Sequence, residues 1–263
     1  MPTKPKLGQN FLNDTQAIGK IAAALGDCSA RTVVEIGPGR GAVTRELASR
    51  AGHVIAVELD RELAGRLRAE FQAERVTVVE QDVLEFDFAA ASQAAGQRLM
   101  VIGNLPYYIT SPILLKLGAS HGVLERAVLM MQREVADRVG AEPGSRDYGL
   151  LSVTVQLYGA VEKLFTLPPG AFLPPPNVHS TVVRWHFAPR LTELQVDEAE
   201  FVRFLRMVFA QKRKTLANNL RAAGMAATGI HEAFDRVGIS AQARAEALPV
   251  EALAALWRNL QAL

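Results

Sequence analysis

Short runs of β-branched and aliphatic residues alternate with helical stretches over the first half of the chain. The strand candidates are Thr32–Ile36, Val54–Val57, Val76–Val79, Leu99–Ile102 and Ala127–Met131. Helical stretches follow the first two of them, at Ala42–Arg50 and Arg61–Ala73. Strands separated by helices pair in parallel through right-handed crossovers, and continuous apolar strands indicate a sheet with both faces covered. The pattern therefore predicts a doubly wound α/β fold.

The strand pattern ends before the last third of the chain. Thr181–Trp185 is the final strand candidate, and Leu150–Tyr158 is compatible with either a strand or a helix. Beyond it, apolar residues recur at helical spacing in three groups, which are Phe201, Leu205, Val208 and Phe209; Ile230, Phe234 and Val237; and Leu253, Leu256, Trp257 and Leu260. We therefore expect an α/β domain at residues 1–188 and a small all-helical domain at 189–263.

Composition excludes several classes of protein. The net charge is only +2, so a nucleic-acid partner requires clustered rather than spread basic residues. The single cysteine, Cys28, excludes a disulfide framework and fits a reducing compartment. The apolar run Ile21–Leu25 is far shorter than the roughly 20 residues of a membrane span. The five histidines lack metal-ligand spacing, so we expect no metal. From the single cysteine and the short apolar run, we expect a cytoplasmic protein with no membrane segment.

A glycine-rich turn, Glu35–Gly41, lies between the first strand and its helix. Gly37 and Gly39 allow a sharp turn and let a ligand approach the main chain without meeting a Cβ atom. Glu58 ends the second strand, where a carboxylate can accept both hydroxyls of a ribose. Asp82 follows the third strand and can accept from an adenine amino group. These three strand ends predict a site for an adenosine-containing cofactor.

Two cofactor classes fit this turn. Gly37, Gly39 and Ala42 also satisfy the dinucleotide fingerprint, with Glu58 at a suitable distance for an NAD ribose. The carboxylate of Glu35 would repel a diphosphate, whereas it would not repel the cationic sulfonium of S-adenosylmethionine. No Gly-Lys-Ser/Thr follows, so the turn is not a P-loop. The sequence favours S-adenosylmethionine and leaves NAD as the alternative.

The fourth strand runs into the tetrapeptide Asn104-Leu105-Pro106-Tyr107. An exocyclic adenine amine is a poor nucleophile, because its lone pair is delocalised into the ring. The side-chain carbonyl of Asn104 and the backbone carbonyl of Leu105 could accept its two N–H bonds, with Pro106 stiffening the chain. Tyr107 offers a ring for stacking the base. The alternative is an ordinary strand-ending turn, in which Asn and Pro are common.

These motifs resemble the ribosomal RNA adenine N6-dimethyltransferase family over nearly the whole chain, and within it the bacterial small-subunit (16S) branch. The resemblance implies a Rossmann-like methyltransferase sheet with a helical RNA-binding domain. Lys6–Leu12 is similar to the family's N-terminal segment, which folds over the cofactor. The cofactor contacts that the resemblance implies are Asn10, Leu12, Gly37, Gly39, Glu58, Asp82 and Asn104.

Two further segments resemble the family. Phe172–Val178 matches its proline-rich loop, which implies that Phe172 packs on the target base opposite Tyr107. Without the resemblance, this segment would be a stiff connection between strands. Phe209–Leu216 matches its basic stretch, whose alternative is a solvated helix face. The phosphate-binding residues that the resemblance implies are Lys212, Arg213, Lys214 and Arg221.

The implied activity is S-adenosylmethionine-dependent dimethylation of N6 on two adjacent adenosines near the 3′ end of 16S rRNA. The implied partner is the small subunit or a pre-30S particle, and we expect a monomer. Three alternatives stay open: a large-subunit rRNA methyltransferase of the antibiotic-resistance type, a DNA adenine methyltransferase, and an RNA-binding assembly factor. The Asn104–Tyr107 tetrapeptide and the basic stretch favour the small-subunit branch.

Overall fold

The computed structural model describes residues 10–262, which form two compact units. The first unit contains the described chain up to Ala136 together with Ala160–Phe187. The second contains Asp137–Gly159 and the chain from Ala188 onward. The sequence predicted a single division into residues 1–188 and 189–263, which stays a prediction, whereas the chain passes from the first compact unit to the second for the last time between Phe187 and Ala188. It did not foresee that Asp137–Gly159 packs with the C-terminal helices.

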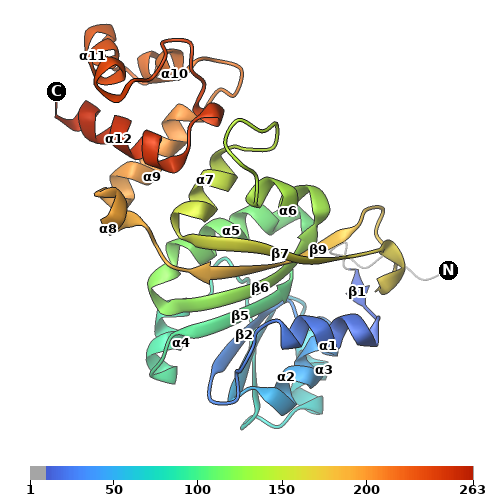
Figure 1. Ribbon diagram of the computed structural model, residues 1–263. Coiled ribbons are helices and arrows are strands. Elements are labelled where there is room, and N and C mark those ends of the chain that lie inside the picture. Colours follow the sequence, from blue (N-terminus) through green and yellow to red (C-terminus); the bar gives the residue numbers. More distant parts are fainter. Residues whose placement is uncertain (1–9, 263) are drawn as a thin grey trace. The chain divides into compact units, whose positions relative to one another are not determined.

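The first unit is built around a seven-stranded sheet of order β4-β3-β2-β5-β6-β9-β7 (Figure 1). The strands are β2 (Thr32–Ile36), β3 (His53–Glu58), β4 (Val76–Glu80), β5 (Leu99–Asn104), β6 (Leu124–Gln132), β7 (Gly159–Leu167) and β9 (Ser180–Phe187). Strands β2 to β6 are parallel, and β9 runs antiparallel to β6. All six sequence-predicted strands are present, and β7 is an additional one.

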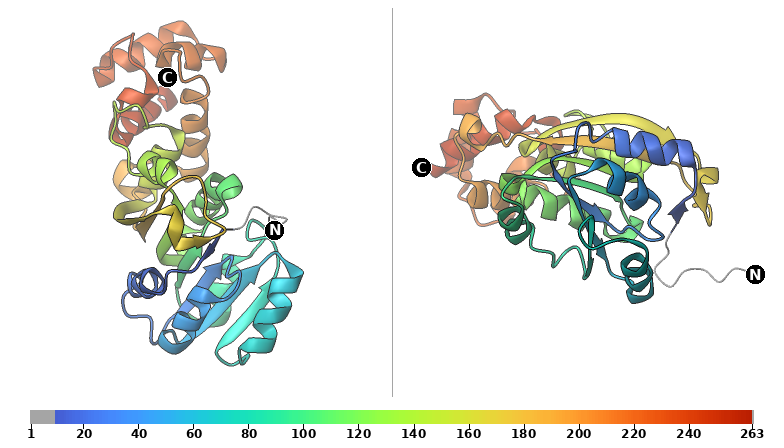
Figure 2. Two further views of the ribbon diagram at one scale, coloured as in Figure 1. Left: turned by 90° about the vertical axis from the view of Figure 1, so that its right-hand side faces the viewer. Right: turned by 90° about the horizontal axis from the view of Figure 1, so that it is seen from below.

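Aspartate side chains fix the starts of three helices of this unit. Asp14, Asp60 and Asp87 each accept two backbone N–H groups in the first turn, which satisfies donors that a helix leaves unpaired. The helices of this part of the chain are α1 (Thr15–Ala23), α2 (Ala42–Arg50), α3 (Arg61–Glu70), α4 (Phe88–Ala95), α5 (Thr110–Ala119) and α6 (Arg133–Val139). They lie on both faces of the sheet (Figure 2), which confirms the doubly wound prediction.

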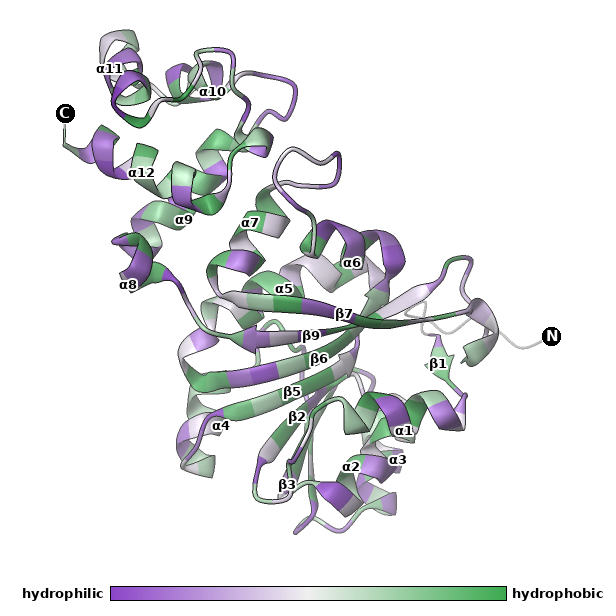
Figure 3. Cartoon of the chain, viewed as in Figure 1, coloured by the Kyte–Doolittle hydropathy of each residue, from purple (hydrophilic) through white to green (hydrophobic). Residues whose placement is uncertain are grey.

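A hydrophobic core joins α1 and α2 to one face of the sheet. Ile21 of α1 and Leu47 of α2 are buried against inward side chains of the strands, among them Val33, Met100 and Val128. Burial of each such side chain contributes roughly 1.5–3 kcal/mol. Figure 3 shows β5 as predominantly hydrophobic, as expected for a strand covered on both faces. The core holds the carboxyl ends of β2, β3 and β5 in a fixed arrangement.

A second, two-stranded sheet joins segments that are far apart in sequence. Strand β1 (Phe11–Leu12) pairs antiparallel with β8 (Phe172–Leu173). The register places Phe11 opposite Leu173 and Leu12 opposite Phe172. The backbone N–H of Asn13 extends the pairing by donating to the carbonyl of Ala171 (2.9 Å). The start of the described chain is thereby fixed to the proline-rich loop.

The second unit is helical. Its helices are α7 (Leu150–Leu157), α8 (Leu191–Leu194), α9 (Glu198–Val208), α10 (Leu216–Ala222), α11 (Ala227–Val237) and α12 (Val250–Gln261). Phe201 on α9 stacks on Phe204 and meets the edge of Trp257 on α12, with 6.0 Å between ring centroids in both pairs. The three predicted helical groups correspond to α9, α11 and α12, and the ambiguous Leu150–Tyr158 segment forms α7. No helix among residues 10–262 is long and apolar enough to cross a membrane.

Candidate active site

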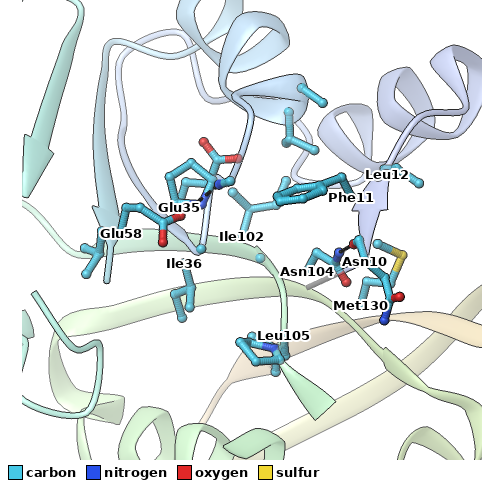
Figure 4. A pocket seen from close by; sticks show the side chains of 18 of the residues that line it. Asn10, Phe11, Leu12, Glu35, Ile36, Glu58, Ile102, Asn104, Leu105 and Met130 are labelled. Carbon is cyan, nitrogen blue, oxygen red and sulfur yellow. Dashed lines mark hydrogen bonds between the residues drawn. The ribbon is translucent and has the colours of Figure 1, made fainter. Parts of the chain in front are cut away.

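A cavity of about 420 Å³ opens at the carboxyl ends of β2, β3 and β5 (Figure 4). This volume lies within the roughly 300–1,000 Å³ of small-molecule and cofactor sites. All seven predicted cofactor contacts line it, together with Leu105, Pro106 and Tyr107 of the tetrapeptide. The predicted Lys6–Gln9 part of the N-terminal segment lies outside the described residues. The cavity occupies the place where ligands bind in open α/β sheets.

The glycine turn forms one wall of the cavity. Gly37 and Gly39 have φ angles of +64° and +59°, which L side chains rarely adopt. A Cβ atom on Gly39 would lie 3.0 Å from two ring carbons of Phe11 in β1. The guanidinium of Arg40 lies 4.4 Å from the centroid of the same ring. The turn is therefore closely covered by the N-terminal strand.

Glu58, at the end of β3, is held by two backbone donors. Its Oε2 accepts the N–H of Gly39 and its Oε1 accepts the N–H of Asp60, both at 2.9 Å. Each carboxylate oxygen retains a second acceptor position, which suits the two hydroxyls of a ribose. Burial raises the pKa of the Glu58 carboxyl, and the two backbone donors oppose that shift.

A second carboxyl group, that of Glu35 at the end of β2, is fully buried at the base of the cavity (Figure 4). Its Oε2 accepts the hydroxyl of Thr44 on α2 at 2.6 Å. The pKa of Glu35 is raised to about 7, mainly by burial; the Thr44 hydrogen bond opposes this shift, and the negative charge of Glu58 adds to it. A cationic group in the cavity would favour the ionised form of this carboxyl.

The far end of the cavity combines an acid with an apolar side chain. Asp82 follows β4, and its Oδ1 accepts the N–H of Leu84 (2.9 Å), which fixes the carboxylate orientation. Leu59 follows Glu58 and lines the cavity while remaining 47% exposed. An adenine ring could pack on Leu59 with its amino group directed to Asp82. Sequence reasoning identified Asp82 but not Leu59, because a single apolar residue in a loop carries no pattern.

Asn104 ends β5 and contacts the N-terminal segment. Its side-chain Nδ2 donates to the backbone carbonyl of Asn10 at 3.0 Å (Figure 4). Because a backbone carbonyl only accepts, this bond identifies the amide nitrogen and leaves the carbonyl Oδ1 as the free acceptor. The next residue, Leu105, is tied to β6 through its N–H, which donates to the carbonyl of Met130 (2.9 Å).

The tyrosine of the tetrapeptide is anchored through its hydroxyl. Tyr107 Oη and Ser180 Oγ on β9 lie 2.9 Å apart. Partial burial raises the pKa of the Tyr107 phenol, and the Ser180 hydrogen bond opposes this shift. The phenol is therefore neutral at physiological pH and presents an uncharged ring at the cavity wall. All four residues of the predicted tetrapeptide thus line the cavity.

Phe172 differs from its predicted position. Only 3% of Phe172 is exposed, and it packs in the hydrophobic core rather than lining the cavity. Leu173 lines the cavity instead and is 55% exposed. Successive side chains of a strand point to opposite faces, so the pairing of β8 with β1 directs Phe172 inward and Leu173 outward. In this structure the Phe172 ring does not face Tyr107 across the cavity.

The predicted RNA-binding residues lie in the second unit. Lys212, Arg213 and Lys214 are exposed in the connection between α9 and α10, and Arg221 is exposed on α10. The buried side chain of Asn219 holds this connection, because its Nδ2 donates to the carbonyls of Val208 (2.7 Å) and Gln211 (3.3 Å). The basic stretch is therefore a turn rather than a helix face.

The cavity fits S-adenosylmethionine better than a dinucleotide. Glu35, Glu58 and Asp82 contribute three carboxyl groups, which attract a cationic cofactor and repel a diphosphate. The two arginines at the cavity are already engaged. Arg45 is paired with Glu70 (2.5 Å), and Arg40 lies over the ring of Phe11. The alternative of an NAD site, which the sequence left open, is disfavoured.

The fold and the cavity define a Rossmann-like, S-adenosylmethionine-dependent methyltransferase. The model of the family described as ribosomal RNA adenine dimethylase matches residues 2–261. The chain belongs to this family.

Relatives and solved structures agree with this assignment. The ribosomal RNA small subunit methyltransferase A of Acidobacterium capsulatum is 61% identical, covering 98% of this chain and 91% of the relative. That of Koribacter versatilis is 52% identical, covering 98% and 94%. A dimethyladenosine transferase from Plasmodium falciparum shares the fold with a TM-score of 0.79 at 24% identity, covering 94% and 95% of the two chains. The 23S rRNA methyltransferase ErmE has a TM-score of 0.70 at 25% identity, covering 96% and 100%.

Proposed function

We propose that this chain transfers methyl groups from S-adenosylmethionine to N6 of adenosine in 16S rRNA, giving N6,N6-dimethyladenosine. The observation that carries the proposal is the orientation of Asn104. Its amide nitrogen is engaged by Asn10, so its carbonyl oxygen is available at the carboxyl end of β5. That acceptor lies in the cavity that also holds the glycine turn and the three carboxyl groups.

S-adenosylmethionine supplies an electrophilic methyl group on its sulfonium. Glu58 would accept the ribose hydroxyls, Asp82 the adenine amino group, and the glycine turn would pack against the remainder. The charge of Glu35 at the base of the cavity favours a cationic ligand over its neutral demethylated product. Asn10 and Leu12 would cover the cofactor from the N-terminal side.

The target amine is positioned rather than deprotonated. The side-chain carbonyl of Asn104 and the backbone carbonyl of Leu105 accept hydrogen bonds from its two N–H groups. These two hydrogen bonds hold the nitrogen lone pair toward the methyl group. Positioning of this kind can supply about 7–11 kcal/mol of barrier lowering. The amine becomes acidic only after methylation and then releases its proton to water. A neutral Asn therefore meets the chemical requirement.

Tyr107 supplies a stacking surface for the target base. Its hydroxyl is fixed by Ser180, so the ring orientation is set before RNA binds. Base–aromatic stacking contributes about 1–3 kcal/mol. The opposite face of the base would meet Leu173 in the observed arrangement. Stacking on Phe172, which the family resemblance implies, requires that ring to leave the core.

The RNA substrate is proposed from the names of the relatives and from the basic turn. The two relatives named above are small-subunit methyltransferases. Lys212, Arg213, Lys214 and Arg221 would bind RNA phosphates, which positions the substrate without reading bases. We propose two adjacent adenosines near the 3′ end of 16S rRNA as the targets, within the small subunit or a pre-30S particle. The chain would act as a monomer in the cytoplasm.

A methyl-transfer assay tests the proposal. Purified protein and S-adenosylmethionine are incubated with undermethylated small subunits, large subunits or duplex DNA, and nucleosides are identified by mass spectrometry. We expect N6,N6-dimethyladenosine from small subunits alone. Dimethyladenosine from large subunits would instead identify the protein as a large-subunit rRNA methyltransferase of the antibiotic-resistance type. Cofactor binding without methylation of any substrate would replace the proposal with an RNA-binding assembly factor.

A further inference from the structure

An exposed aromatic ring lies at the edge of the cavity and has no role in the mechanism above. Tyr108 follows Tyr107 in a 3-10 turn, Tyr107–Ile109. Its side chain lines the cavity, yet 62% of the residue is exposed, more than for any other large hydrophobic residue of the described chain. A large exposed apolar side chain beside a ligand cavity is typical of a binding surface.

The turn that carries Tyr108 is rigidly held. The carbonyl of Pro106 accepts the N–H of Ile109 (3.2 Å) and the hydroxyl of the buried Thr110 (3.0 Å). Successive residues of a 3-10 helix are rotated by about 120°. Tyr107 is therefore directed to Ser180 while its neighbour remains exposed.

We propose that Tyr108 stacks on the nucleotide base adjacent to the target adenine, as a positioning residue for the RNA strand. This inference rests on the proposed function. Two consecutive aromatic residues can receive two consecutive bases, and every base offers a face for stacking. The side chain of Tyr108 is uncharged, so a base fits it better than a phosphate, which binds arginine or lysine. The exposed Leu173 at the same cavity supplies additional apolar surface.

This arrangement explains how one cavity can serve neighbouring adenosines. While one adenine occupies the cavity beside Tyr107, the next would rest on Tyr108. Moving the strand by one nucleotide brings the neighbouring base from Tyr108 to Tyr107 and leaves the Tyr108 ring free for the base that follows it. The neighbouring base thus sets the register of the strand.

Steady-state methylation of undermethylated small subunits provides the first test, using Tyr108→Ala, Tyr108→Leu and Tyr108→Phe. Because stacking needs an aromatic ring, we expect kcat/KM for the particle to fall on the order of tenfold in the Ala and Leu variants. The Phe variant should retain the wild-type value. The KM for S-adenosylmethionine and the Tm should be unchanged in all three. Equal kcat/KM in Tyr108→Ala and wild type, or full activity in Tyr108→Leu, would overturn the proposal.

A fluorescence measurement separates this inference from the proposed function. Single-stranded RNA with 2-aminopurine on the 5′ or the 3′ side of an adenosine is titrated with each variant in the presence of the demethylated cofactor. Wild type and Tyr108→Phe should quench one of the two probes, and Tyr108→Ala should not. Identical quenching by wild type and Tyr108→Ala overturns the role of Tyr108 even if small subunits are methylated. A wild type that quenches through Tyr108 but methylates no RNA refutes the proposed function alone.

Discussion

The side-chain amide of Asn104 donates a hydrogen bond of 3.0 Å to the backbone carbonyl of Asn10, which is 94 residues earlier in the chain. This contact joins the end of β5 to the segment that precedes β1. It also determines which end of the Asn104 side chain is available to substrate. The acceptor that we propose for the adenine amine is therefore oriented by a residue in the N-terminal segment.

Replacement of Asn104 separates catalysis from RNA binding. We expect Asn104→Ala to lower kcat on the order of 100-fold, because one positioned acceptor is lost. Asn104→Asp should be similarly impaired, since a carboxylate cannot donate to the Asn10 carbonyl. Single-turnover methylation and particle binding are measured in parallel. Unimpaired methylation by Asn104→Ala would contradict the assignment.

Tyr107 and Ser180 should behave as one unit. Tyr107→Phe and Ser180→Ala each remove the 2.9 Å hydrogen bond and should lower kcat/KM a few-fold, because the ring loses its anchor. The double variant should lose no more than either single one, since the two residues share one interaction. Tyr107→Ala should reduce catalysis far more than cofactor affinity. A loss confined to cofactor affinity, with unchanged turnover at saturation, would contradict this role.

Cofactor binding should depend on pH through Glu35. Its pKa is raised from 4.5 to about 7, so the folded protein retains a proton that the unfolded chain loses. The contribution of this group to the free energy of unfolding is fully present below pH 4.5. It falls by about 3 kcal/mol as the pH rises through 7. A cationic ligand favours the ionised carboxylate, so affinity for S-adenosylmethionine should increase across this window with proton release.

Calorimetry in two buffers of different ionisation enthalpy measures that proton release. The matched variant Glu35→Gln keeps the size of the side chain and its ability to accept from Thr44, but it cannot titrate. It should release fewer protons on binding and show a weaker pH dependence of unfolding. If the variant and wild type release equal numbers of protons at pH 6, the proton release on cofactor binding comes from another group. Glu58 would be one such group, because burial also raises its pKa.

Two glycine substitutions should have opposite effects on stability. Gly103 lies opposite Ile36 in the sheet, and a Cβ atom there would be 2.9 Å from the Ile36 carbonyl oxygen. Gly103→Ala should therefore destabilise the protein by about 1–3 kcal/mol. Gly65 lies on α3 with no neighbour within 4 Å of an added Cβ, so Gly65→Ala should stabilise by about 0.5–1 kcal/mol. Urea unfolding of both variants checks the two signs, and destabilisation by Gly65→Ala would refute the second.

Loss of the positive charges of the basic stretch between α9 and α10 should weaken RNA binding, and the size of the loss should depend on salt concentration. Replacing Lys212, Arg213 and Lys214 with Ala should lower affinity for small subunits and flatten its dependence on salt concentration, because fewer counterions are released. Arg66→Ala on α3 removes one exposed charge of an ion pair with Glu62 and serves as the control. A salt dependence identical to that of wild type would contradict phosphate binding by the turn.

The sequence predicted the elements whose signals are local. The predicted bounds of the strand Thr32–Ile36 and of the helix Ala42–Arg50 match the observed ones. Here a continuous apolar run, a glycine turn and a segment of helical periodicity follow one another directly in the sequence. Leu150–Leu157 could not be resolved, because Ser152–Val155 are all buried and no polar face marks a helical period. The strand Gly159–Leu167 was missed, since its exposed and partly buried positions follow no clean alternation.

The site residues were likewise predicted only where a local sequence signal marks their position. Asn104 and Glu58 follow closely on predicted strands and end the observed β5 and β3, so their convergence followed from the topology of a parallel sheet. Phe172 was expected in the cavity, but its direction depends on a two-residue pairing with β1 that leaves no periodic signal. Tyr108 and Leu173 escaped notice because single exposed apolar residues acquire meaning only beside a cavity.

The pairing of β1 with β8 has a thermodynamic consequence. One strand belongs to the segment that contacts Asn104, and the other carries Leu173 at the cavity. If a bound cofactor stabilises the first strand and a bound base stabilises the second, the pairing couples the two binding events. Such linkage is reciprocal, so each ligand would then change the affinity for the other by the same factor. Under the proposed function, the two-stranded sheet would make the methyl donor and the RNA mutual effectors.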